Sequence, residues 1–142
     1  MLNFGYCIWM SPTKNHEWNL MTNGFNIHMS VKTNLNYQQS LDFISNNKGD
    51  YNIEVKLIGN YIIDNTDNFH SLFFDVECEG IKPCWWPDDA HISFLYQYNK
   101  AFTEDQINHV INNLKNKSII LNNMSINRCD GHFLQWQEVN NL

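Results

Sequence analysis

The hydrophobic and polar positions along the chain form short patterns that predict both strands and helices. Alternating or continuous apolar runs are typical of strands, whereas apolar residues three to four positions apart are typical of helices. By this criterion the sequence predicts strands over residues 4–10, 25–33, 51–63, 69–79, 90–98, 118–127 and 132–139. With two helices among them, the predicted order is β-β-α-β-β, a loop and then β-α-β-β, so the second half loosely repeats the first.

The two helices are predicted from apolar spacing and capping residues. Residues 37–46 carry Leu41 and Ile44 at near-helical spacing and close on a turn at residues 46–49. The second helix begins at Thr103, which forms the pattern of a capping box with Gln106. One face of this second helix is apolar and consists of Ile107, Val110, Ile111 and Leu114.

Turn-forming residues separate the predicted strands. Residues 64–68 predict a hairpin between the strands over 51–63 and 69–79, and Asp130-Gly131 predicts a tight hairpin near the C-terminus. Residues 82–87 contain two prolines, which cannot donate to a sheet ladder, so we expect a loop with exposed aromatic residues there.

No linker rich in proline, glycine or serine divides the chain, so residues 1–142 are expected to form a single domain. The element order favours an α+β fold that is bilobal, with pseudo-twofold antiparallel sheets and flanking helices.

Composition narrows the classes of protein. Apolar residues make up 43% of the 142 positions, which is enough for a core, and the formal net charge of −6 argues against a long nucleic acid as partner. The four cysteines lack Cys-x-x-Cys spacing, so we expect reduced thiols. Neither a membrane span nor a secretory signal is predicted, so a cytoplasmic location is expected. The 23 asparagines indicate an AT-rich genome, as in many large DNA viruses.

Two predicted strands carry the same short motif, His-x-Ser, as His28-Met29-Ser30 and as His91-Ile92-Ser93. Residues two apart in a strand share a face, so each histidine projects beside its serine. The first segment has a polar face of Asn26, His28, Ser30 and Lys32 and an apolar face of Ile27, Met29 and Val31. The second has a polar face of Asp89, His91, Ser93 and Gln97 and a core face of Ala90, Ile92, Phe94, Tyr96 and Tyr98.

Two imidazoles and two hydroxyls around one cavity suit phosphodiester chemistry. Histidine titrates near neutral pH, so His28 and His91 can serve as a general base and a general acid, in either assignment. The hydroxyls of Ser30 and Ser93 can donate hydrogen bonds to the non-bridging oxygens of a phosphodiester. No carboxylate cluster with metal-ligand spacing accompanies the histidines, so the predicted mechanism uses no metal and no cofactor.

The paired motifs, about sixty residues apart in a small α+β chain, resemble the two-histidine (2H) phosphoesterase superfamily. Residues 91–96 and the segment Ile8-Trp9-Met10-Ser11-Pro12 are similar to its cyclic phosphodiesterase branch. The resemblance implies a bilobal fold whose motif strands line a central groove. It also implies hydrolysis or cyclising cleavage of 2′,3′-cyclic or 2′,5′-linked nucleotide phosphodiesters.

Four aromatic residues near the motifs are candidate substrate contacts. Trp85 and Trp86 precede the second motif, where an aromatic ring can stack on a base, and packing between lobes is the alternative. Tyr6 and Trp9 lie near the first motif strand, and core packing explains them equally well. Lys32 shares the motif face and is expected to be solvated.

The sequence therefore predicts a metal-independent phosphodiesterase for a small nucleotide. The negative net charge and the virus-like composition favour a signalling nucleotide, such as a cyclic dinucleotide or 2′,5′-oligoadenylate, whose cleavage in a host cytosol would serve immune evasion. One alternative is a 2′,3′-cyclic phosphodiesterase acting on RNA ends or ADP-ribose cyclic phosphate. Another is a non-catalytic nucleotide-binding sponge, which would need no matched acid and base.

Overall fold

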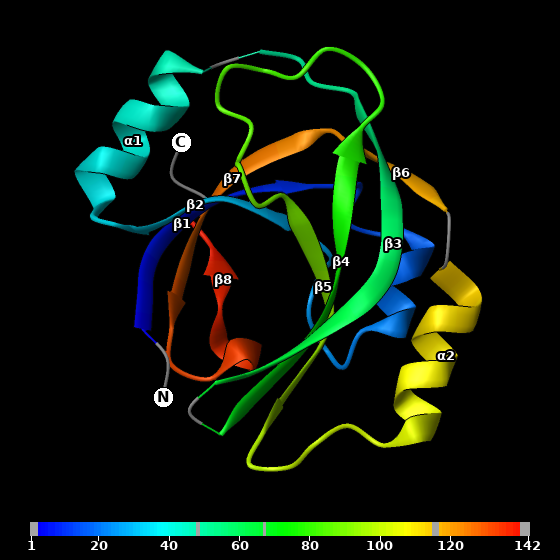
Figure 1. Cartoon of the computed structure of the whole chain (residues 1–142). Helices are drawn as coiled ribbons and strands as arrows, with labels where there is room; N and C mark the ends of the chain where they lie inside the picture. Colours follow the sequence, from blue (N-terminus) through cyan, green and yellow to red (C-terminus); the bar gives the residue numbers. More distant parts are fainter. Residues whose placement is uncertain (1–2, 48, 67, 115–116, 140–142) are drawn as a thin grey trace.

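A single curled antiparallel sheet organises the protein (Figure 1). The computed structural model describes residues 3–47, 49–66, 68–114 and 117–139, so Lys48 and Asp67 of the two predicted turns lie outside the described residues. The strands are β1 (Asn3–Ser11), β2 (Met29–Leu35), β3 (Ile53–Thr66), β4 (Phe69–Cys78), β5 (His91–Tyr98), β6 (Ser118–Leu121), β7 (Asn123–Asp130) and β8 (Gln137–Glu138). The helices are α1 (Tyr37–Asn46) and α2 (Glu104–Leu114), with 3₁₀ turns η1 (Glu17–Met21) and η2 (Phe133–Gln135).

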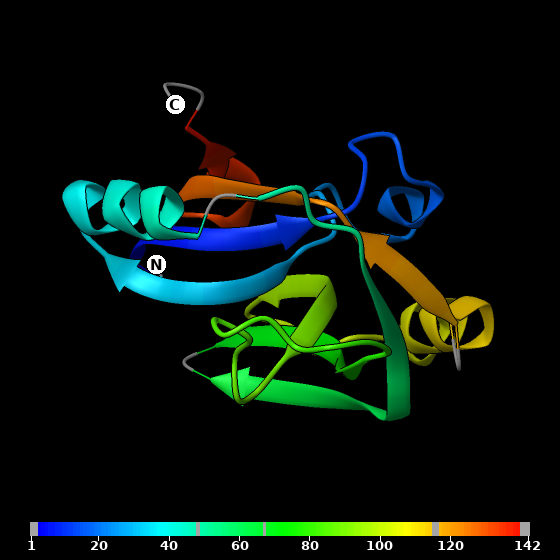
Figure 2. The same ribbon diagram turned by 90° about the horizontal axis from the view of Figure 1, so that it is seen from above.

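The strand order across the sheet is β6-β3-β4-β5-β2-β1-β7-β8, and all the pairings are antiparallel. Four strands lie on each side of the junction between β5 and β2, where Met29 pairs with Ile92. Seen from above, β1, β2 and β7 run in one layer beside α1, and β3 and β4 lie in a second layer (Figure 2). The predicted α+β class with antiparallel sheet is therefore confirmed.

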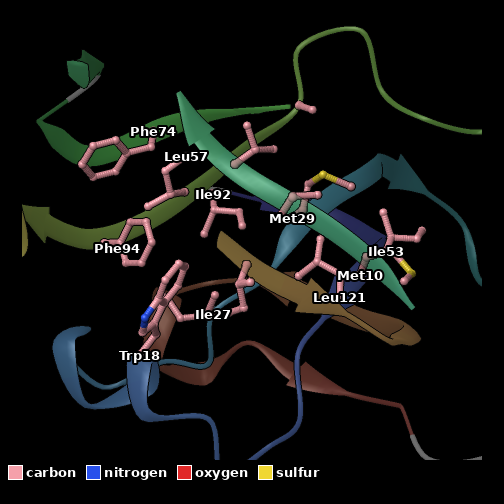
Figure 3. Close-up of a cluster of buried hydrophobic side chains, with 14 of the residues drawn as sticks. Met10, Trp18, Ile27, Met29, Ile53, Leu57, Phe74, Ile92, Phe94 and Leu121 are labelled. Atoms are coloured by element: carbon pink, nitrogen blue, oxygen red, sulfur yellow. The ribbon is translucent and has the colours of Figure 1, made fainter. Parts of the chain in front are cut away.

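The main core lies on one face of this curled sheet. The alternation predicted for the first motif segment is confirmed, because Ile27, Met29 and Val31 are all buried there. Side chains from β1, β3, β4, β5 and β6 join them, and Trp18 of η1 packs against Phe94 (Figure 3). Val110 and Leu114 of α2 are also buried in this cluster. The polar residues between these apolar positions consequently face away from the core.

The helices begin where capping residues satisfy free backbone amides. In α1 the Asn36 side chain accepts from the Gln39 N–H, and the Gln39 side chain accepts from the Asn36 N–H. The Thr103 hydroxyl likewise accepts from the Gln106 N–H at 3.2 Å, and the Gln106 side chain accepts from the Thr103 N–H at 2.8 Å. The capping box predicted at Thr103 and the helix predicted over residues 37–46 are both confirmed.

The C-terminal elements differ from the prediction. The single strand expected over residues 118–127 is two strands, because the chain leaves β3 after Leu121 and joins β1 from Asn123 onward. The tight hairpin at Asp130-Gly131 is wrong, and the strand expected over residues 132–139 shortens to the two residues of β8. The His132 side chain accepts from the Leu134 N–H, which stabilises η2, and only the two residues of β8 pair with β7.

The first motif strand is also shorter than predicted, because it begins at Met29 and not at residue 25. Before Met29 the backbone is not paired with a strand at Ile27, because the N–H of Ile27 donates to the side-chain oxygen of Asn19 at 2.7 Å. Among the residues described, no helix is long and apolar enough to cross a membrane.

Candidate active site

A cavity of about 350 Å³ opens on the sheet face opposite to the main core, and both His-x-Ser motifs reach it. His28 and Ser30 come from β2 and the segment before it, and His91 and Ser93 come from β5. These two strands are neighbours at the centre of the sheet. Trp9 of β1 lines the same cavity. The structure thus brings together all four motif residues and one of the four aromatic candidates.

His28 is enclosed by aromatic rings. Its ring lies parallel to the Trp9 indole, with centroids 3.5 Å apart and an angle of 7° between the planes. Burial lowers the pKa of His28 to about 4, the hydrogen bond with the Asn26 carbonyl acts in the opposite direction, and His91 lowers the pKa further. This effect of His91 means that the two imidazoles lie within electrostatic reach of each other. His28 is therefore a neutral imidazole at physiological pH.

The two histidines are oriented in the same way. Nδ1–H of His28 donates to the Asn26 carbonyl at 2.8 Å, and Nδ1–H of His91 donates to the Asp89 carbonyl at 2.7 Å. Each acceptor is the carbonyl two residues earlier in the chain. Because a carbonyl oxygen can only accept, Nδ1 must carry the hydrogen in both rings. In the neutral form, Nε2 of each ring is then free to accept a proton or a hydrogen bond.

A β-bulge in β5 changes which side chains face the cavity. The register along β4 and β5 shifts between the pairs Phe73–Ser93 and Leu72–Leu95, so Phe94 is an extra residue. Beyond this point the alternation reverses, and Tyr96 lines the cavity. The prediction that Tyr96 belongs to the core face is therefore wrong. Burial raises the pKa of Tyr96 to about 12, and a hydrogen bond with Ser93 partly offsets this rise.

The three other predicted aromatic contacts lie outside the cavity lining. Trp85 is buried in the main core, where its Nε1–H donates to the Tyr51 hydroxyl at 3.2 Å, so its predicted exposure in the loop is wrong. Trp86 is half-buried beside Trp85, with ring centroids 6.2 Å apart. Tyr6 packs against Tyr37 of α1, with ring centroids 5.4 Å apart. Packing accounts for these three rings.

Several lining residues were not predicted from the sequence. On the β3–β4 side the cavity is lined by the polar residues Asp64, Thr66 and Ser71 and by the ring of Phe69. Asp64 and Thr66 fall in the segment expected to be a turn, but β3 continues to Thr66 and carries both into the sheet. The sequence signal for these lining residues was the two-residue spacing of Asp64 and Thr66, which places both on one face of a strand. Ser71 pairs with Asp64 across the hairpin and shares that face.

On the β1–β7 side the cavity is bounded by aromatic rings and thiols. Phe4 and Trp136 meet edge to face, with ring centroids 5.7 Å apart. Cys7 and Cys129 are buried beside Trp9 and are free thiols. The hydrogen bond with Cys7, together with burial, raises the pKa of Cys129. This side therefore offers an apolar surface for a ligand.

No known protein-family model matches the chain, and no characterised protein matches it with significant sequence similarity. Within the described part of the chain, no three His, Cys, Asp or Glu side chains come together as a set of metal ligands. A functional assignment consequently depends on the geometry of the cavity.

Proposed function

We propose that the protein is a phosphodiesterase that cleaves a small cyclic or 2′,5′-linked nucleotide, with His28 and His91 as its proton-transfer pair. The single observation that carries this proposal is the repeated local geometry of the two motifs. Each imidazole donates through Nδ1 to the carbonyl two residues earlier, and each has a serine hydroxyl two residues later on the same cavity. A matched pair of this kind is what acid and base catalysis of one reaction requires.

The environment of each histidine supports an assignment of roles. His28 is buried against Trp9 and is neutral at physiological pH, so its Nε2 acts as the general base. His91 is more exposed than His28, and in this proposal it is the general acid. The two roles are fixed by different surroundings, although the local hydrogen bonds are the same.

The proposed reaction is a displacement at phosphorus. Nε2 of His28 takes a proton from the nucleophile, which is water in hydrolysis or a neighbouring ribose hydroxyl in cyclising cleavage. The nucleophile forms a new P–O bond, the bond to the leaving oxygen breaks, and His91 gives a proton to that oxygen. The hydroxyls of Ser30 and Ser93 donate to the non-bridging oxygens, where charge accumulates in the transition state.

The size of the cavity and the order of strands support this reading. A volume of about 350 Å³ lies at the lower end of the range of roughly 300–1,000 Å³ that is typical of small-molecule sites. The partition of four strands on each side of the β5–β2 junction is in keeping with the two lobes that the resemblance to two-histidine phosphoesterases implies. A cavity of this size favours a short nucleotide over a long RNA end.

The test is product identification with a panel of substrates. Cyclic dinucleotides, 2′,5′-oligoadenylate, 2′,3′-cyclic nucleotides and ADP-ribose cyclic phosphate are incubated with the protein, and the products are identified by mass spectrometry. Cleavage of at least one diester is expected, and His28→Gln and His91→Gln should each lower its rate by about 10²-fold or more. His109→Gln, on the exposed face of α2, is the matched control and should keep full activity.

The same experiment separates catalysis from simple binding. Tight binding of a nucleotide without any product would support a sponge and overturn the catalytic proposal. Full activity of either histidine variant, in a protein that melts at the wild-type temperature, would overturn the assignment of the pair.

A further inference from the structure

The two sides of the cavity differ in charge. Asp64, Thr66 and Ser71 line it from β3 and β4, whereas Phe4 and Trp136 line it from the β1–β7 side. The motif histidines lie between these two sides, with His91 on β5 and His28 directly before β2, because the order of strands is β3-β4-β5-β2-β1-β7. A ligand whose phosphate lies between the histidines can extend toward a side that carries a carboxylate, two hydroxyls and the Phe69 ring, or toward the aromatic side of Phe4 and Trp136.

The Asp64 carboxylate lines the cavity at its exposed rim. Asp64 pairs with Ser71 across β3 and β4, and Ser71 pairs with Tyr96 across β4 and β5, so the three side chains lie in one row. The Thr66 hydroxyl donates to Oδ1 of Asp64 at 3.2 Å. A carboxylate has about four lone-pair positions, so Asp64 can still accept hydrogen bonds from a ligand.

The one cation that the proposed mechanism places in the cavity is protonated His91, which carries the acid proton. Among the described residues that line the cavity, none is lysine or arginine, and Asp64 is the one carboxylate. Arg128 does not line the cavity and forms an ion pair with Asp130, with Nε and Oδ2 3.5 Å apart. Lys32 lines a separate depression with Trp85 and Trp86. The scissile phosphodiester meets imidazoles and serine hydroxyls, whereas a second phosphate near β3 would meet the Asp64 carboxylate and the neutral hydroxyls of Thr66 and Ser71.

We infer that Asp64 is a specificity-determining residue, and that it selects substrates whose one negative charge is the scissile phosphodiester. The carboxylate accepts hydrogen bonds from the neutral hydroxyl or N–H groups of the substrate part on the β3–β4 side, and it repels a phosphate there. This inference rests on the proposed function. It favours a diester with a free 5′-hydroxyl over the same diester with a 5′-phosphate.

The test compares a matched pair of substrates, 2′,5′-linked adenylyl-adenosine with a 5′-hydroxyl and the same dinucleotide with a 5′-monophosphate. Wild-type kcat/KM should be about tenfold higher for the 5′-hydroxyl form at low salt, and the ratio should shrink as ionic strength rises. Asp64→Asn should raise kcat/KM for the phosphorylated form and narrow the ratio. Asp42→Asn, an exposed position on α1, removes the same charge elsewhere and should leave the ratio unchanged.

Binding is measured separately, so that this inference and the proposed function can fail independently. The His91→Gln variant is titrated with both dinucleotides by calorimetry. Tighter binding of the 5′-hydroxyl form that depends on Asp64, without turnover by the wild type, would support charge selection and overturn the catalytic proposal. Equal kcat/KM and equal Kd for the two forms would overturn the role of Asp64, and so would an unchanged preference in Asp64→Asn.

Discussion

Trp9 of β1 stacks face to face on His28, which directly precedes β2, with ring centroids 3.5 Å apart and planes within 7°. The indole covers one side of the imidazole, and His28 keeps 4% of its surface exposed. The ring is therefore largely shielded from bulk water, and burial is the largest cause of its lowered pKa. Packing against Trp9 thus helps to keep His28, the candidate general base, in its neutral form.

The first prediction is a loss of stability in mild acid. The pKa of His28 is about 4 in the folded protein and 6.5 ordinarily, so between these values the unfolded chain binds a proton that the folded protein does not. The free energy of unfolding should fall by up to about 3 kcal/mol as the pH drops from 6.5 to 4, and no further below 4. Urea denaturation at a series of pH values measures this change.

Two variants isolate the contribution of His28. His28→Gln removes the titrating group and should flatten the pH dependence, whereas His109→Gln on α2 should leave it intact. An equal slope in the wild type and in His28→Gln would assign the acid sensitivity to other groups.

The second prediction concerns the stacking partner. Trp9→Leu removes part of the cover over the imidazole, so the pKa of His28 should rise toward 6.5, and Trp9→Phe should change it less because a flat ring remains. NMR titration of the imidazole signals measures the pKa directly. Trp136→Leu is the control, since this ring lines the same cavity but packs against Phe4 and Tyr96. An unchanged pKa in Trp9→Leu would contradict the shielding role of the indole.

The sequence was sufficient where a local pattern decides the structure. The two His-x-Ser motifs could be placed on one polar surface because side-chain alternation in a strand depends on neighbouring residues alone. The capping box at Thr103 is equally local, and α2 begins there as expected. The centre of the candidate site and the helices were accessible to sequence reasoning for this reason.

Other parts of the site depend on pairing between distant segments. The bulge at Phe94 arises from the register with Leu72 and Phe73, so nothing within β5 itself signalled that Tyr96 would face the cavity. Trp85 lies in a loop with two prolines, but the Tyr51 hydroxyl gives its N–H a partner and allows its burial. Such outcomes follow from tertiary packing, which periodicity does not encode.

The third prediction concerns the hydrogen bonds that stabilise β5 at Tyr96, after the bulge at Phe94. The Tyr96 N–H donates to Oδ1 of Asn23 at 3.1 Å, and the Asn23 amide donates to the Tyr96 carbonyl. The Asn23 side chain takes the place of strand pairing here, because the pairing between β2 and β5 is limited to Met29 and Ile92. Asn23→Ala should lower the free energy of unfolding by about 1–2 kcal/mol, as measured in urea.

Asn108→Ala on the exposed surface of α2 is the matched control for Asn23→Ala. It should be neutral or slightly stabilising, since alanine favours helix. Equal stability of the two variants would mean that Asn23 does not support β5.

The fourth prediction separates the serines from the histidines. Ser30→Ala and Ser93→Ala remove donors to the phosphate and should lower kcat by about tenfold or more, less than the histidine variants do. Ser30→Thr keeps the donor at a half-buried strand position and should retain most activity. Steady-state kinetics on the diester found in the substrate panel is the measurement, with Ser45→Ala on α1 as control. Fully active alanine variants would assign phosphate binding to other groups, such as Tyr96.

The last prediction joins pH and metal dependence. If His28 is the base, the rate should fall on the acid side only as His28 becomes protonated, and its pKa is lowered to about 4. The acid limb of kcat/KM should therefore lie well below the ordinary imidazole value of 6.5, with limbs that belong to the coupled pair of histidines. Because proton transfer is assigned to side chains, saturating EDTA should leave both the height and the position of this profile unchanged. Activity that EDTA abolishes and that zinc or manganese restores would contradict the proposed mechanism and would direct attention to Asp88, Asp89 and His91 as ligands. An acid limb that stays in the same place in His28→Gln would contradict the choice of base, even if the activity resists chelation.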